Sequence, residues 1–173
     1  PILPVTDNLW IHPRARHLPL PYTNTFLVLK DDALLTIEGD KAYASADDGA
    51  TWCQHPLFSS PGPQPAFEYA LVRGADGAII LVYTDAATRR WGWDEKEHRA
   101  IPNPRGNVCS IRSCDEGRTW SVPVLLREHG GSIIQGIVTA AGRVVVPIQV
   151  LLREPDRWGQ MSYVSDDDGA TWR

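Results

Sequence analysis

The chain has 173 residues, and its 17 Lys and Arg against 21 Asp and Glu give a formal net charge of −4. A mildly acidic chain lacks the basic surface that nucleic acid or an anionic membrane attracts, so neither is expected as a partner. No apolar run reaches the roughly 20 residues that span a bilayer. The first ten residues lack the features of a signal peptide, and the localisation stays undetermined.

Cysteine, histidine and glycine usage narrows the class further. The three Cys residues form no Cys-x-x-Cys and the five His residues form no His-Glu-x-x-His, so neither a metal nor another cofactor is indicated. The 14 Gly and 14 Pro residues punctuate short apolar runs, which favours strands and turns over helices. The sequence therefore predicts an all-β fold.

In chain order, residues 1–25 are expected to form an arm, and a hairpin follows it. Phe26–Ile37 is an apolar run, a turn and a second apolar run, which predicts two paired strands. The same shape recurs at Tyr69–Tyr83 and at Ile134–Ile148, where Asp-Gly and Ala-Gly mark the turns.

Further strands are expected after these hairpins. The predicted third strands are Lys41–Ala44, Val108–Arg112 and Met161–Val164, and the predicted fourth strands are Cys53–Phe58 and Val122–Leu126. Four antiparallel strands in each repeated unit are typical of the blade of a β-propeller.

An octapeptide with the pattern Ser-x-Asp-x-Gly-x-Thr-Trp occurs three times, at Ser45–Trp52, Ser113–Trp120 and Ser165–Trp172. Ser and Asp side chains can close a tight turn on backbone N–H groups, Gly permits a positive φ, and Trp anchors the turn on a sheet. We therefore interpret the repeated residues as structural. They are Ser45, Asp47, Gly49, Thr51, Trp52, Ser113, Asp115, Gly117, Thr119, Trp120, Ser165, Asp167, Gly169, Thr171 and Trp172.

These octapeptides resemble the Asp-boxes of bacterial neuraminidase repeats. The chain is thus similar to part of a sialidase-type β-propeller. The resemblance implies three four-stranded antiparallel blades at residues 26–58, 66–126 and 133–173, the last of them truncated.

Sialidase-type propellers have six blades, so three blades imply half of a ring. An open half-ring would leave apolar faces and strand edges in water. We expect either a fragment of a longer chain or a homodimer that completes the ring. A third alternative is that Pro1–Leu9, within the N-terminal arm, supplies the missing outer strand of the third blade.

Antiparallel alternation predicts which loops share an end of the blades. The hairpin turns and the Asp-boxes lie at one end, and the loops between second and third strands lie at the other. The second set varies in length, from Gly39–Asp40 through Asp85–Gly106 to Val150–Gly159. Variable loops on a rigid scaffold are usual places for binding sites, and sialidase-type enzymes also place their site opposite the Asp-boxes.

The long second loop carries the candidate substrate-binding residues Arg89, Arg90, Trp91, Trp93 and Arg105. Arg can bind a carboxylate through two hydrogen bonds, and indole rings cover the apolar face of a sugar. This set suits a glycan with an acidic sugar. The alternative is a solvated loop whose Trp residues pack on the blade.

The resemblance also implies a catalytic set, which the chain matches poorly. Sialidases hold the substrate carboxylate with three Arg, and use an Asp acid/base and a Tyr nucleophile activated by Glu. The first Arg is absent from the corresponding stretch Tyr22–Phe26, and Asp40 is the candidate acid/base, with a turn residue as the alternative. Two functions stay open: a sialidase-like glycoside hydrolase, or a non-catalytic Asp-box module that binds glycan or protein.

Overall fold

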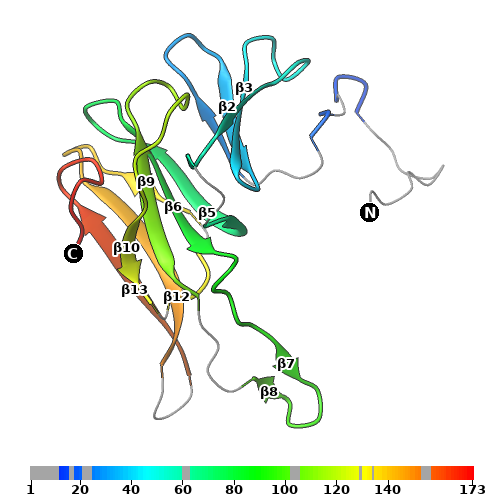
Figure 1. Ribbon diagram of the computed structural model, residues 1–173, viewed down its shortest axis with the longest axis vertical. Helices are drawn as coiled ribbons and strands as arrows, with labels where there is room; N and C mark the ends of the chain where they lie inside the picture. Colours follow the sequence, from blue (N-terminus) through cyan, green and yellow to red (C-terminus); the bar gives the residue numbers. More distant parts are fainter. Residues whose placement is uncertain are drawn as a thin grey trace.

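The protein is described here by a computed structural model, in which all regular structure is β (Figure 1). The strands form several antiparallel sheets, so the predicted all-β class is confirmed. The described residues are 12–15, 18–20, 25–59, 63–101, 106–128, 130–133, 135–152 and 157–173. Pro1–Leu9, the candidate outer strand, lies outside them. Within the described ranges there is no helix long and apolar enough to cross a membrane.

The first sheet is a meander of four strands in chain order. It contains β1 (Phe26–Val28), β2 (Leu34–Glu38), β3 (Lys41–Ser45) and β4 (Cys53–Pro56). The register pairs Leu34 with Ser45 and runs without a bulge to the tight turn after Glu38. The predicted strands of this unit match those of the structure to within one or two residues.

The second sheet repeats this arrangement with longer strands. It contains β5 (Pro65–Arg73), β6 (Ile79–Asp85), β9 (Val108–Ser113) and β10 (Val124–Arg127), with β6 and β9 at the centre. Every residue of β6 is buried because the sheet has a neighbour on each face.

The long loop of the second unit contains a small hairpin that the sequence did not predict. Its strands are β7 (Trp93–Asp94) and β8 (Arg99–Ala100), and it projects away from the larger sheets (Figure 1). Asp94 closes its turn by accepting hydrogen bonds from the N–H groups of Lys96 and Glu97 at 3.0 and 3.1 Å.

The third sheet has three strands, β11 (Ile137–Val138), β12 (Val144–Leu152) and β13 (Arg157–Ser165). The prediction of a loop over Val150–Gly159 is wrong. Strands β12 and β13 pair continuously, from Val144 opposite Ser165 to Leu152 opposite Arg157. Arg173 exchanges two backbone hydrogen bonds with Val164, at 2.9 and 3.0 Å.

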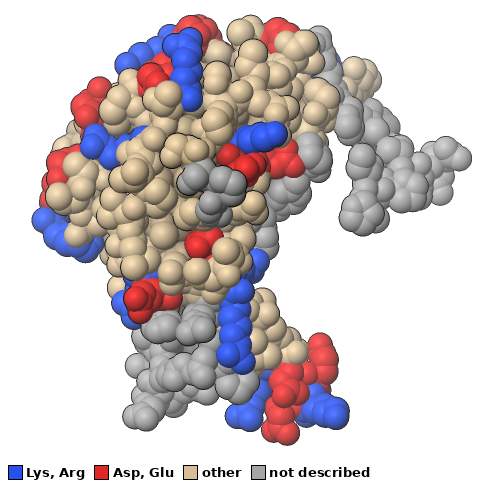
Figure 2. Space-filling model, viewed as in Figure 1, with Lys and Arg blue, Asp and Glu red and all other residues tan. Residues whose placement is uncertain are grey.

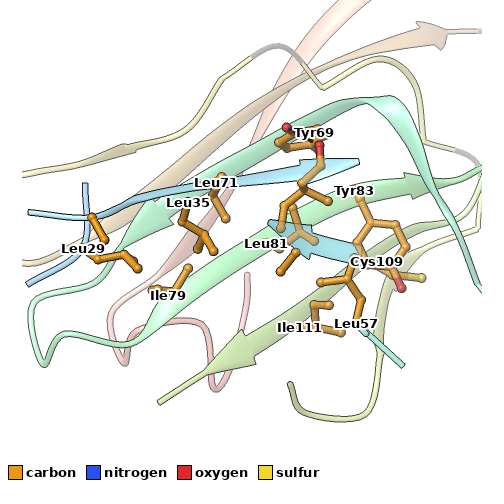
Figure 3. Close-up of a cluster of buried hydrophobic side chains, with 13 residues drawn as sticks. Leu29, Leu35, Leu57, Tyr69, Leu71, Ile79, Leu81, Tyr83, Cys109 and Ile111 are labelled. Atoms are coloured by element: carbon orange, nitrogen blue, oxygen red, sulfur yellow. Dashed lines mark hydrogen bonds between the residues drawn. The ribbon is translucent and has the colours of Figure 1, made fainter. Parts of the chain in front are cut away.

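Alternating residues of β6 form the two cores that join the sheets. Ile79, Leu81 and Tyr83 belong to the cluster shared with Leu35 and the rest of the first sheet (Figure 3). The residues between them, such as Ile80 and Val82, belong to the cluster shared with the third sheet. Burying one such side chain stabilises the fold by about 1.5–3 kcal/mol, so packing between sheets is the main source of stability.

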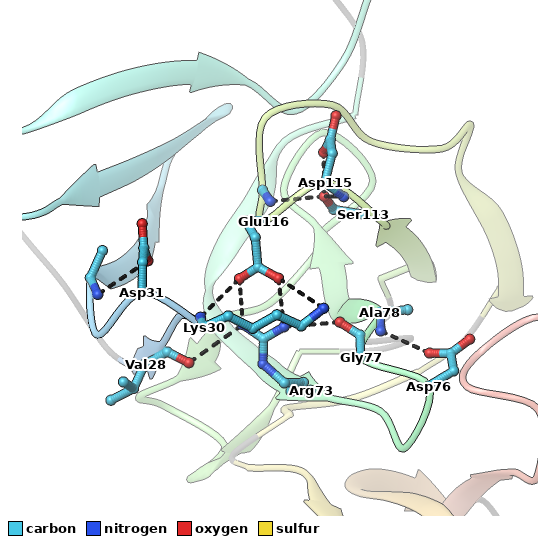
Figure 4. Close-up of polar contacts among 12 residues, drawn as sticks. Val28, Lys30, Asp31, Arg73, Asp76, Gly77, Ala78, Ser113, Asp115 and Glu116 are labelled. Atoms are coloured by element: carbon cyan, nitrogen blue, oxygen red, sulfur yellow. Dashed lines mark hydrogen bonds and ion pairs between the residues drawn. The ribbon is translucent and has the colours of Figure 1, made fainter.

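A carboxylate from each of two octapeptides also joins neighbouring sheets. Glu116 of the second sheet accepts a hydrogen bond from the N–H of Lys30 in the β1–β2 turn at 3.3 Å, and pairs with both terminal nitrogens of Arg73 (Figure 4). Asp168 of the third sheet accepts from the N–H groups of Ala75 and Asp76 in the β5–β6 turn, at 2.9 and 2.6 Å. We call these two contacts, of Glu116 and of Asp168 with the turn of a neighbouring sheet, the inter-sheet clasp.

Gly74 leaves the space that Asp168 occupies. A Cβ at residue 74 would lie 2.4 Å from Cγ of Asp168, while the negative φ of Gly74 would itself tolerate alanine. We expect Gly74→Ala to lower the free energy of unfolding by about 1–3 kcal/mol, because a charged acceptor loses its backbone donors. Chemical denaturation measures this change. In an Asp168→Ala background the same substitution should cost nothing, and an equal cost in both backgrounds would contradict the clasp.

Candidate functional site

The first octapeptide closes on itself through its own side chains. Ser45 Oγ accepts from the N–H of Gly49 and donates to Asp47 Oδ1, both at 2.8 Å. Asp47 accepts the N–H of Thr51 at 2.8 Å through Oδ1 and the Thr51 hydroxyl at 2.7 Å through Oδ2. Trp52 donates its indole N–H to the carbonyl of Gly49 at 3.1 Å. Both carboxylate oxygens of Asp47 are thus engaged inside the turn.

The other two copies have nearly the same geometry. Asp115 accepts the Thr119 N–H and hydroxyl at 2.8 and 2.6 Å, and Asp167 accepts those of Thr171 at the same distances. The third copy differs at Trp172, whose buried indole nitrogen has no partner among the described residues. Each octapeptide is thus a turn that its own Ser, Asp and Thr residues close.

Hydrogen bonding shifts the titration of these carboxyls. The donors of Thr51 and Ser45 lower the pKa of Asp47 to about 2, and the donors of Thr171 and Ser165 lower that of Asp167 to about 2. For Asp115 burial opposes the shift, yet its hydrogen bonds still hold the pKa below the ordinary value. All three groups are therefore ionised at neutral pH.

The β7–β8 hairpin lies at the end opposite the octapeptides and presents aromatic and charged groups. Trp91 and Trp93 are 47% and 50% exposed. Trp93 is the first residue of β7, and Trp91 lies two residues before it in the chain. Arg90, which directly precedes Trp91, is also exposed. Charged side chains of both signs cover the hairpin turn (Figure 2).

Arg89 is held differently from Arg90. One of its terminal nitrogens lies 3.7 Å from Glu68 Oε2 on β5, and both side chains are about a quarter exposed. This ion pair connects the base of the long loop to the sheet. Arg105, the remaining candidate, lies outside the described residues, so the structure places four of the five predicted binding residues.

Asp40 lies in the two-residue turn between β2 and β3, at the same end of its sheet as the projecting hairpin of the second sheet (Figure 1). Its side chain is exposed, and its carbonyl accepts the N–H of Leu57 at 2.9 Å. Gly39 beside it has a φ of 57°, which keeps the turn tight. The arrangement is that of a turn residue with a solvent-facing carboxylate.

Next to this turn, Glu38 and Tyr43 share a face of the β2–β3 pair that sequence reasoning did not single out. Burial raises the pKa of Glu38, and one of its carboxylate oxygens is buried without a partner among the described residues. Burial, Glu38 and Asp40 raise the pKa of the Tyr43 hydroxyl. The period-two alternation of strands would have placed this pair together, but nothing in its spacing marks it as chemical.

The described tyrosines with shifted acidity do not provide an activated nucleophile. Burial raises the pKa of Tyr83 and Tyr163 as well as that of Tyr43, which disfavours the phenolate. Among the described residues no group of three or more His, Cys, Asp or Glu is placed to hold a metal ion. The three cysteines are free thiols.

Comparison with known proteins identifies the family. The model of the BNR repeat-like domain matches residues 70–173, which is more than half of the chain, and the chain therefore belongs to this family. It is also similar to the crystal structure of a protein of unknown function from Dyadobacter fermentans DSM 18053, with a TM-score of 0.52 and 16% identity. That match covers 82% of this chain and 49% of the other, so the chain spans about half the length of that structure. No curated protein matches the chain.

The low pKa of the octapeptide carboxyls predicts an acid-sensitive fold. A carboxyl with a folded-state pKa of about 2, below its ordinary value of 3.8, stabilises the fold above pH 4, and this contribution is lost as the pH falls towards 2. We expect the Tm to fall over this interval. Thr51→Val removes one donor to Asp47, so its Tm should be lower at neutral pH and fall less steeply in acid. Parallel curves for the two proteins would contradict this assignment.

Proposed function

We propose that the three larger sheets are successive blades of a sialidase-type β-propeller, and that the chain binds terminal acidic sugars. Support for the blades comes from three features. Each sheet is a meander with its octapeptide after the third strand, β5 lies beside both β1 and β11, and neighbouring sheets pack face to face. The blade boundaries we propose are 26–58, 66–126 and 133–173.

One observation carries the proposed binding function, namely the projecting β7–β8 hairpin with its two exposed Trp side chains and Arg90. A cluster of exposed apolar side chains can mark a surface that binds a ligand or a partner. A guanidinium beside them supplies two parallel donors for the carboxylate of an acidic sugar. The hairpin also lies at the end where loop length varies, and the opposite end has short, uniform turns.

The ion pair between Arg89 and Glu68 suits this role as a support. It fixes the start of the loop to β5 while the hairpin beyond it extends outward. Arg89 is therefore assigned to positioning, and the proposed direct contacts with the sugar come from Arg90, Trp91 and Trp93. Arg105 stays a proposed contact on sequence grounds alone.

Hydrolysis is the second candidate function, with Asp40 as the proton donor. Its support is that Asp40 is exposed on the same end as the hairpin. The raised pKa of Tyr43, Tyr83 and Tyr163 gives no support for a nucleophile within the described residues. Binding without turnover is for that reason the function we place first.

Binding is tested by titrating the chain with a sialoside and with the matching neutral glycoside that lacks the acidic sugar. We expect binding of the sialoside only. Trp93→Ala and Arg90→Ala should each weaken it roughly tenfold, which corresponds to about 1.4 kcal/mol. Arg118→Ala is the matched control, because Arg118 is an exposed arginine on the second octapeptide at the other end. Equal affinity for both glycosides, or an equal effect of Arg118→Ala, would contradict the proposal.

Catalysis is tested with a fluorogenic sialoside. We expect no turnover by this chain. Turnover that disappears in Asp40→Asn, while Asp32→Asn on the opposite end of the same sheet leaves it unchanged, would instead establish the hydrolase and the acid role of Asp40. Circular dichroism of each variant checks that a loss of turnover does not come from unfolding.

A further inference from the structure

The inter-sheet clasp follows a rule that repeats along the chain. The acidic residue before the octapeptide Gly reaches back to the hairpin turn of the preceding sheet. Glu116 contacts the β1–β2 turn (Figure 4), and Asp168 contacts the β5–β6 turn. The Gly itself packs on the preceding sheet. A Cβ on Gly117 would lie 2.9 Å from Leu35, and one on Gly169 would lie 3.1 Å from Ile80.

The third sheet offers the same receiving turn, and nothing occupies it within the described residues. Its turn, Thr139–Arg143, has the hydrogen bonds of the other two turns. The N–H of Thr139 donates to the carbonyl of Arg143 at 2.8 Å, and the N–H of Gly142 donates to the carbonyl of Thr139 at 2.9 Å. Ala140 and Ala141 correspond to Ala75 and Asp76, whose N–H groups donate hydrogen bonds to Asp168. Both are exposed, and their N–H groups have no acceptor among the described residues.

The apolar surface beside this turn, formed by Val145 and Ile137, is also partly exposed. Val145 pairs with Val164 as Leu35 pairs with Ala44 and Ile80 with Arg112, so these three positions are equivalent. Leu35 and Ile80 are fully buried under the next sheet, whereas Val145 is only half-buried. Ile137, its partner on β11, is 54% exposed.

The first sheet carries the complementary group. Asp48 precedes Gly49 with a φ of 54°, close to the 59° of Glu116 and the 51° of Asp168. Its carboxylate is exposed and has no partner among the described residues. The apolar face behind it is partly exposed, with Phe26 40% exposed at the position where the second sheet buries Leu71.

We propose that a second copy of this chain docks head to tail, with Asp48 and Gly49 of one copy on the Thr139–Arg143 turn and Val145 of the other. Within the described residues each copy has one acidic group and one receiving turn without a partner, so two copies can satisfy both sites of each other in a closed pair. This inference deepens the proposed propeller, since three blades from each copy would complete its ring. It does not depend on sugar binding.

In the single chain Leu18 packs against Gly49. A Cβ on Gly49 would lie 2.8 Å from Leu18, just as one on Gly117 would contact Leu35 and one on Gly169 would contact Ile80. Leu18 therefore covers Gly49 of the first octapeptide, and docking replaces Leu18 with Val145 of the second copy. This exchange predicts that Leu18 competes with the pairing.

Thr139 sets how tightly Asp48 can be held. It stands where the second sheet has Gly74, the position that leaves room for both contacts of Asp168. The first sheet has Leu29 there, and its turn is reached by the longer Glu116 through one N–H. Asp48 should accordingly gain the second contact when Thr139 is replaced by Gly.

Sedimentation equilibrium of the 173-residue chain over a wide range of concentration tests the proposal. We expect a species of twice the 19.2 kDa chain mass in equilibrium with the monomer. Asp48→Asn should weaken the pairing about tenfold or more. Asp32→Asn should leave the pairing unchanged. Asp32 is also exposed and has a positive φ of 62°, but it lies on the β1–β2 turn and not in the octapeptide. Leu18→Ser and Thr139→Gly should each tighten it.

A monomer at every concentration for both the natural chain and Thr139→Gly would overturn the proposal. Equal weakening by Asp48→Asn and Asp32→Asn would also overturn it, and a ladder of larger masses would exclude the closed pair. Circular dichroism identifies any variant that fails to fold, and the remaining variants keep the test decisive. Mass reports assembly and titration reports sugar binding, so either proposal can fail while the other holds.

Discussion

The inter-sheet clasp is the interaction on which the arrangement of the sheets depends. Apolar faces attract each other without strong direction, so burial alone would allow neighbouring sheets to slide or rotate. A carboxylate held by specific backbone N–H groups of the next sheet fixes one position. The clasp is possible because two successive residues of the octapeptide have positive φ, such as Glu116 at 59° and Gly117 at 83°. This backbone turns the acidic side chain outward while Asp115 and Ser113 close the turn.

The clasp also explains why the two ends of the molecule differ. At the octapeptide end each turn must fit its neighbour, and even a Cβ at Gly74 would collide with Asp168. Neither clasp carboxylate, Glu116 or Asp168, contacts the loops at the opposite end. The second sheet can therefore carry the β7–β8 hairpin there, while the first sheet has only Gly39 and Asp40. A variable surface on a fixed scaffold is the usual setting for a binding site.

Much of the fold could be predicted because its signals are local. Alternation of apolar residues, turn residues and the repeated octapeptide located nearly every strand of the larger sheets. The errors occurred where local signals conflict. Polar residues around Arg153–Trp158 indicated a loop, yet β12 and β13 extend to Leu152 and Arg157, since backbone pairing continues regardless of side-chain polarity. The two-residue strands of the hairpin were too short to give a pattern.

The candidate site was predictable only as a composition. Sequence reasoning found the Arg and Trp residues of the long loop, but could not show that Arg89 pairs with Glu68 while Arg90 and Trp93 face solvent. Residues 89 and 68 are separated by a full strand pair, and only the packing of the loop on β5 brings them together.

The sequence by itself determined the strands, the three self-closing turns and the family, because each depends on contacts among residues a few positions apart. Only the tertiary structure decided how the sheets are joined. The octapeptide positions before Gly are Asp48, Glu116 and Asp168, all acidic, and nothing in the motif distinguishes the two that hold a neighbouring sheet from the one that does not. That difference depends on which backbone N–H groups the fold brings beside each carboxylate, which is a property of the tertiary structure.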